Sequence, residues 1–94
     1  MNTLERIYDL VIKHSRQASF YGKAKVIYRD NKIILKSYDT EVCELEADTL
    51  EIKKIGYYSL TTQKHINEFL MQHGHDKMNK KQVDELEQKL EEEK

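Results

Sequence analysis

Four histidines and one cysteine are the side chains with the widest chemical use in this 94-residue chain. The closest spacing among them is His73-Gly74-His75, which we expect at the end of a helix. A zinc site usually needs a pattern such as CxxC or HExxH, and the sequence contains neither. Cys43 lies in a run with strand-like alternation, where a cysteine usually serves as a small core residue. We therefore expect no metal ligands and no cofactor.

Several hydroxyl side chains precede another histidine, an arrangement that could supply a nucleophile and its general base. Ser59, Thr61 and Thr62 stand shortly before His65, but hydroxyls in front of a helix usually serve as N-caps. The chain also lacks a glycine-rich phosphate loop and an EF-hand pattern. These observations predict a protein that is not an enzyme and has no catalytic residues.

Charge is arranged in two blocks, although the formal net charge is only −1. Residues 13–36 carry a net charge of +6, and residues 39–51 carry −6. Cations at alternate positions of a strand would line one face, where they could contact phosphates, with apolar residues between them for bases. This candidate binding surface comprises Lys23, Lys25, Ile27, Arg29, Lys32, Ile34, Lys36 and Tyr38.

A protein partner suits the same region. The acids of the following strand would lie beside the cations and weaken their attraction for phosphates. The chain has six tyrosines and no tryptophan, and exposed tyrosines are typical of protein interfaces. The candidate partner contacts are Glu44, Glu46, Tyr57 and Tyr58. The residues alone leave both a protein and a nucleic acid open as partners.

A β-hairpin over residues 22–38 would position the candidate binding surface. Asp30 and Asn31 tolerate the positive φ of a two-residue type I′ turn, which pairs Arg29 with Lys32. The opposite, core-facing side of this hairpin would then consist of Ala24, Val26, Tyr28, Ile33, Leu35 and Ser37.

A third strand over residues 42–47 and a fourth near residues 50–58 complete the predicted sheet. A three-residue loop before the third strand would turn Cys43, Leu45 and Ala47 to the core and leave Val42 on the cationic side. A loop one residue shorter would reverse these faces.

Two helices are expected to cover the core face. Apolar residues with helical spacing predict one over residues 3–18, with Thr3 as its N-cap; these residues are Leu4, Ile7, Tyr8 and Val11. The second, over residues 61–73, would begin after Ser59 or Thr61 and end at Gly74.

Residues 75–94 are polar and charged, with a capping-box pattern at Asn79 and Gln82 and a narrow seam of Val83, Leu86 and Leu90. Such a tail helix would pack on the body, pair with a copy of itself or stay partly disordered. We expect a homodimer, formed by tail pairing or by sheet edges.

Two segments stand out as motifs. The first leads from Tyr21-Gly22-Lys23 to Leu35-Lys36-Ser37-Tyr38-Asp39-Thr40, with the pattern L-x-S-Y-x-T. The second runs from Tyr58 to Leu70, with the pattern Y-S-x-T-T-x-x-H-I-x-E-F-L. Together, over about residues 20–74, they resemble a group of small uncharacterised proteins from phages and mobile elements of Gram-positive bacteria. The resemblance implies a phage or prophage origin and an accessory role, and it carries over no catalytic residues.

Two looser analogies concern function. Four strands followed by a helix are similar to a small coactivator fold that binds single-stranded DNA as a dimer, although this chain lacks a strongly basic total charge. Its size and charge pattern are similar to those of phage anti-defence proteins such as anti-CRISPR inhibitors, which occupy the surface of a nucleic-acid-handling enzyme.

The predicted fold is α+β: a three- to four-stranded antiparallel sheet with an N-terminal helix and a helix after the sheet on one face, plus a polar C-terminal helix. We expect one domain over residues 1–74 and a charged tail over 75–94. No apolar run approaches the ~18 residues of a membrane span, no signal-peptide pattern is present, and one cysteine suits a cytoplasmic protein.

The expected function is that of a non-enzymatic, phage-type accessory binding protein. It would inhibit a host or phage protein complex that handles nucleic acid or serves in defence, by occluding its surface, without a membrane partner. The alternative is single-stranded nucleic-acid binding through the basic hairpin face.

Overall fold

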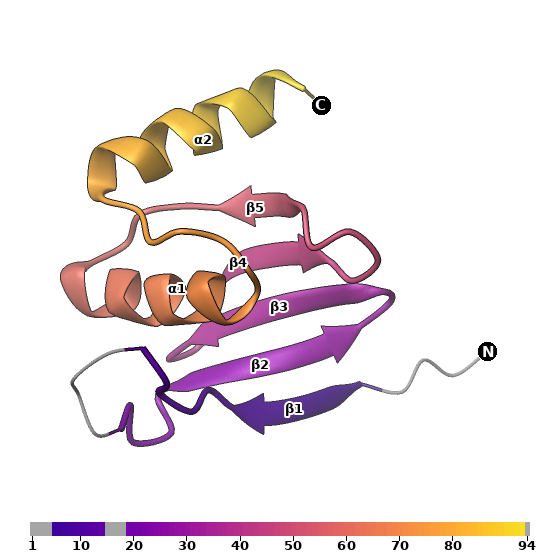
Figure 1. Ribbon diagram of the computed structural model, residues 1–94, viewed down its shortest axis with the longest axis vertical. Coiled ribbons are helices and arrows are strands. Elements are labelled where there is room, and N and C mark those ends of the chain that lie inside the picture. The colour runs from indigo at the N-terminus through magenta and orange to yellow at the C-terminus, as the bar shows by residue number, and fades with distance from the viewer. Residues whose placement is uncertain (1–4, 15–18, 94) are drawn as a thin grey trace.

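The computed structural model describes residues 5–14 and 19–93 of the chain. Five strands form one antiparallel sheet in chain order, and two helices follow (Figure 1). The strands are β1 (Arg6–Asp9), β2 (Ala24–Arg29), β3 (Lys32–Ser37), β4 (Thr40–Glu46) and β5 (Ile52–Ile55). The helices are α1 (Leu60–Gln72), which crosses one face of the sheet, and α2 (Lys80–Glu92), which lies beyond β5 at the edge opposite β1. The α+β class is therefore confirmed, and the sheet has more strands than the three or four predicted.

The β2–β3 hairpin has the register that its turn residues predict. Arg29 lies opposite Lys32 and Ala24 opposite Ser37. Asp30 and Asn31 have φ of +50° and +63°, as a type I′ turn requires, and their short polar side chains tolerate this conformation. The turn thus assigns each β2 and β3 side chain to one of the two sheet faces.

The connection from β3 to β4 is shorter than predicted, and a β-bulge compensates for it. Only Tyr38 and Asp39 form the loop, since Ser37 pairs directly with Thr40. The register then shifts by one residue, so that Lys36 lies opposite Glu41 and Leu35 opposite Cys43. A bulge leaves one extra residue in one strand, and here that residue is Val42.

Because of the bulge, one prediction about the faces of β4 is confirmed and another is wrong. Cys43 and Leu45 face the core as expected, because the extra residue restores the faces that a two-residue loop alone would reverse. Val42, expected on the cationic side, is 1% exposed and belongs to the core. A second register shift lies between β4 and β5, and it allows Ile52 and Ile55, three residues apart, both to be buried.

The predicted helix over residues 3–18 is wrong. Arg6–Asp9 form strand β1, which pairs with β2 along its length, and Leu10–His14 are not helical. Thr3, Leu4 and residues 15–18 lie outside the described residues. Ile7, Tyr8, Val11 and Ile12 are β-branched or aromatic, types that favour strands, and β2 offers a hydrogen-bonded partner that a short isolated helix lacks.

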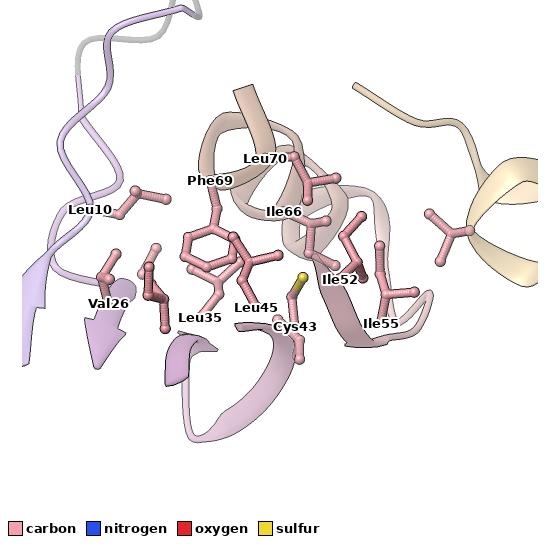
Figure 2. Packing of buried hydrophobic residues seen from close by; sticks show 14 of the residues in the cluster. Leu10, Val26, Leu35, Cys43, Leu45, Ile52, Ile55, Ile66, Phe69 and Leu70 are labelled. Carbon is pink, nitrogen blue, oxygen red and sulfur yellow. The ribbon is translucent and has the colours of Figure 1, made fainter. Parts of the chain in front are cut away.

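The core lies between α1 and the sheet face beneath it. Figure 2 shows Ile66, Phe69 and Leu70 of α1 directed at side chains of the sheet, which include Leu35, Cys43 and Leu45. The second predicted helix is confirmed as α1: Ser59 is its N-cap, accepting a hydrogen bond from the Thr62 N–H, and Gly74 follows with φ of +82°.

Helix α2 packs on the body. Asn79 and Gln82 form the predicted capping box, and Val83 is completely buried. Leu86 and Leu90 pack against the same core, partly buried. Of the three expectations for the tail, packing on the body is therefore the one observed, and the apolar seam is used within the chain.

Candidate binding surfaces

Acidic partners accompany most cations of the sheet face turned away from α1. Lys25 binds Asp9, and Lys32 lies 3.5 Å from Glu44. Arg29 contacts both Glu5 at 3.2 Å and Glu41 at 2.9 Å. The hydrogen bond from Arg29 lowers the pKa of Glu41, although burial opposes this change. The face is a network of compensated charges rather than a positive stripe.

Ile27 and Ile34 were expected to contact bases between the cations, but they are buried and cannot form part of the candidate binding surface. Each is only 2% exposed, although neither α1 nor α2 covers their face of the sheet. Ile34 lies between Lys32 and Lys36 in β3, so the ion pair from Arg29 to Glu41 crosses over it. Long charged side chains can shield apolar residues in this way while their charged ends stay in water.

The other predicted contact residues are dispersed. Tyr38 lies in the β3–β4 loop, with its ring 5.8 Å from that of His65, and it lines a small hollow with Lys23, Lys25 and Lys36. The Lys80 Nζ lies over the Tyr57 ring, 5.5 Å from the ring centroid. Tyr58 lines a hollow between β5 and α2, and burial raises the pKa of its phenol. Glu46 accepts a hydrogen bond from Asn31. Glu44 and Glu46 thus lie beside Lys32, as expected, and Glu44 also lines the hollow with Tyr58. Tyr57, against Lys80 of α2, lies apart from this group.

The two sequence motifs meet in a buried polar cluster. The Ser37 hydroxyl lies 2.8 Å from His65 Nδ1 and 3.0 Å from the Thr62 hydroxyl, and all three side chains are buried. Burial lowers the pKa of His65, which favours the neutral imidazole, and the Phe20 ring packs edge-on against it with centroids 4.4 Å apart. The contact between the buried Ser37 and His65 side chains joins α1 to β3.

A second buried polar group, Glu68, fixes the chain after β1. It accepts hydrogen bonds from the His14 N–H at 2.9 Å and from Gln72 at 2.7 Å, and Gln72 also donates to the Val11 carbonyl. Burial opposes ionisation of Glu68, but these hydrogen bonds outweigh it and lower its pKa. The segment after β1 is thereby held beside the C-terminal half of α1.

The most exposed aromatic pair lies where α1 leaves the sheet uncovered. Tyr8 and Tyr28, 52% and 40% exposed, meet edge to face with ring centroids 5.7 Å apart. They separate two hollows of about 750 and 440 Å³. Arg6, Asn31 and Ala47 line the larger hollow, and Leu10, Met71 and His73 line the smaller. We call this region the tyrosine groove.

The sequence pattern does not predict this groove. It predicts Tyr8 on a helical stripe and Tyr28 on the core face of the hairpin, whereas both rings are exposed beside α1. The sequence signal for a strand here is the run of β-branched and aromatic residues Ile7, Tyr8, Val11 and Ile12, since no strict polar–apolar alternation is present.

No metal or membrane feature is present in the part of the chain that the structure describes. Among residues 5–14 and 19–93, no three His, Cys, Asp or Glu side chains gather into a possible metal site. No helix in these ranges has the length and apolar character to cross a bilayer.

Comparison with other proteins gives a family and no function. No curated protein and no solved structure matches the chain. A family of unknown function, DUF8033, matches residues 8–85, which span β1 to α2. The chain therefore belongs to the family of unknown function DUF8033.

Proposed function

We propose that this protein is a non-enzymatic binding protein that acts by occupying a surface of another protein. The observation that carries the proposal is the tyrosine groove, in which two half-exposed tyrosines flank hollows next to a free sheet edge. Tyrosines supply large contact areas at little entropic cost and are enriched at protein interfaces.

The partner that we propose is a host or phage complex that handles nucleic acid or serves in defence. The accessory role follows from the resemblance to phage and mobile-element proteins, and occlusion needs no chemistry from the chain. Among the described residues, Ser37 and His65 are buried together, and burial raises the pKa of the Cys43 thiol to about 12, so neither group is placed to act as a surface nucleophile. A reducing compartment such as the cytoplasm suits this protein.

Single-stranded nucleic-acid binding is the second candidate, and one observation favours it. Lys23, Lys25 and Lys36 line a hollow of about 350 Å³ together with Tyr38. Lys25 is already bound to Asp9, and Lys36 lies opposite Glu41. Because these acids weaken the local field, we place this function second.

A photo-crosslinking experiment tests the proposal. A photoreactive phenylalanine analogue replaces either Tyr8, at the β1 edge, or Tyr58, at the opposite edge with a similar exposure of 49%. Because the groove is the proposed contact, position 8 should crosslink one protein in lysate of a host cell, and position 58 should not. Excess unlabelled wild-type protein should compete, and unlabelled Tyr8→Ser protein should not.

Two outcomes contradict the proposal. Equal crosslinking from positions 8 and 58 would show that the groove is not the contact. Tight oligonucleotide binding that falls with log salt at a slope of ~0.7 per phosphate contact would instead support the second candidate.

A further inference from the structure

Strand β1 is an open sheet edge. Leu10 donates to the Ala24 carbonyl, so the alternation of an antiparallel pair directs the backbone groups of Arg6 and Tyr8 toward β2. The N–H and C=O groups of Ile7 and Asp9 therefore point outward, and no described residue pairs with them in the sheet. The other edge, β5, lies beside α2. An open edge is a template on which a further strand can form hydrogen bonds.

Arg6 is the uncompensated charge at this edge. Glu5, Asp9, Lys25 and Arg29 are all ion-paired with one another or with Glu41, whereas Arg6 has no acidic partner among the described residues. Residues 1–4, 15–18 and 94 include no Asp or Glu that could supply one. Arg6 lies opposite Tyr28, on the groove side of the sheet.

The acids near Arg6 do not neutralise the groove. Asp30 lines the larger hollow together with Arg6, and Asp9 lines the smaller one, but neither carboxylate forms an ion pair with Arg6. Asp9 is bound to Lys25. Lys13 lines the smaller hollow at the far end. The groove therefore combines aromatic surface with excess positive charge, which complements an acidic and apolar ligand.

We propose that the partner binds by adding an extended segment to the outer edge of β1, with a carboxylate opposite Arg6 and an apolar side chain beside Tyr8. Arg6 and Tyr8 are two residues apart on one face, about 6.7 Å along the strand. The added segment must present its acidic and apolar side chains with the same spacing of two. This inference rests on the proposed function and specifies the chemistry of the partner segment.

A second copy of the chain fits this edge less well. When two β1 strands pair around a two-fold axis in one continuous sheet, residues opposite each other must share a face. Arg6 lies on the groove side, whereas Glu5 and Asp9 lie on the other side with Arg29 and Lys25. No such register places an acid opposite Arg6, so a homodimer formed by pairing of two β1 edges would leave this charge unpaired.

A peptide titration followed by NMR tests the inference. The probe is a capped heptapeptide, Thr-Val-Thr-Val-Thr-Asp-Thr, with control peptides that carry Asn or Lys in place of Asp. The Asp peptide should shift the amide signals of Ile7 and Asp9 and slow their hydrogen exchange. The Asn peptide should bind about 10-fold more weakly, because a hydrogen bond between charged groups is lost.

Charge reversal gives the sharper comparison. Arg6→Glu should lose affinity for the Asp peptide and prefer the Lys peptide, whereas Lys64→Glu, at an exposed site on α1, should behave as wild type. Equal binding of the three peptides, or unchanged Ile7 and Asp9 amides at millimolar peptide, would overturn the inference. Protection of these amides that grows with protein concentration in the absence of peptide would assign the edge to a second copy instead. Crosslinking from position 8 without protection of the two amides in that complex would overturn strand addition and leave the proposed function standing.

Discussion

At the residue scale, His65 shows how one buried side chain connects the two sequence motifs. Its Nδ1 lies 2.8 Å from the Ser37 hydroxyl, which in turn lies 3.0 Å from the Thr62 hydroxyl. A buried polar group that loses its partner costs about 1–3 kcal/mol, so each member of the cluster constrains the others. The cluster ties α1 to β3 at one fixed position, and this fixes how much of the sheet α1 leaves open.

The pH dependence of stability should follow from this burial. Burial lowers the pKa of His65 in the folded state below its ordinary value, so the unfolded chain takes up a proton first as the pH falls. The contribution of neutral His65 to the free energy of unfolding is fully present above about pH 6.5. It is lost progressively as the pH falls from there to the pKa of His65 in the folded protein. Urea unfolding should show a free energy of unfolding that decreases as the pH falls from 7.5 to ~5.5.

Two variants identify the group responsible. His65→Gln should remove part of this slope, and Lys64→Gln, at an exposed neighbouring position of α1, should keep it. Glu68 acts in a separate range: its folded pKa is lowered, so its contribution is lost at more acid pH, below about 4.5. A slope that persists unchanged in His65→Gln would assign the effect to another group.

At the scale of elements, the β3–β4 hairpin depends on its bulge. Two-residue loops preserve strict alternation, and strict alternation would turn Cys43 and Leu45 to the charged face. The extra residue, Val42, prevents this and is itself buried. The bulge therefore keeps the apolar side chains of β4 on the core face and its acidic side chains on the charged face.

Substitution at the bulge should report its burial. Val42→Ala should lower the free energy of unfolding by about 1–3 kcal/mol, because two buried carbon atoms are lost and a small cavity remains. Lys36→Ala, directly beside the register shift but on the charged face, should change it by less than ~0.5 kcal/mol. Urea denaturation of both variants provides the measurement. Similar values for the two would place Val42 at the surface, as the sequence pattern suggested.

Turns and helix ends are the features that the sequence predicts correctly. Asp30-Asn31 defined the β2–β3 register, and Ser59, Gly74 and Asn79 marked helix boundaries, because turns and caps depend on neighbouring residues. Ile7, Tyr8 and Val11 have the spacing of a helix but are residue types that favour strands. The chain forms a strand here because β1 pairs with β2. The tyrosine groove depends on how far α1 extends over the sheet, which is a tertiary property.

At the scale of the whole molecule, the two sheet edges are treated differently. Helix α2 packs against β5 and buries Val83, whereas β1 carries exposed Ile7 and Tyr8. β1 is also short and flanked by charges, features that restrain uncontrolled pairing of an edge strand. Helix α2 thus lies along one edge, and the other edge is accessible beside the groove.

Removal of α2 should abolish this difference between the edges. A chain that ends at Gly74 loses the burial of Val83 and uncovers Ile52 and Ile55 at the β5 edge. We expect its unfolding midpoint to fall, and light scattering to show self-association at concentrations where the full chain does not change its mass. Val83→Ala, in which α2 remains in place, should lower the midpoint by a smaller amount and leave the mass unchanged. If instead the full chain is a dimer and the shortened chain a monomer, α2 would be a dimerisation element, and its packing on β5 would not be its main role.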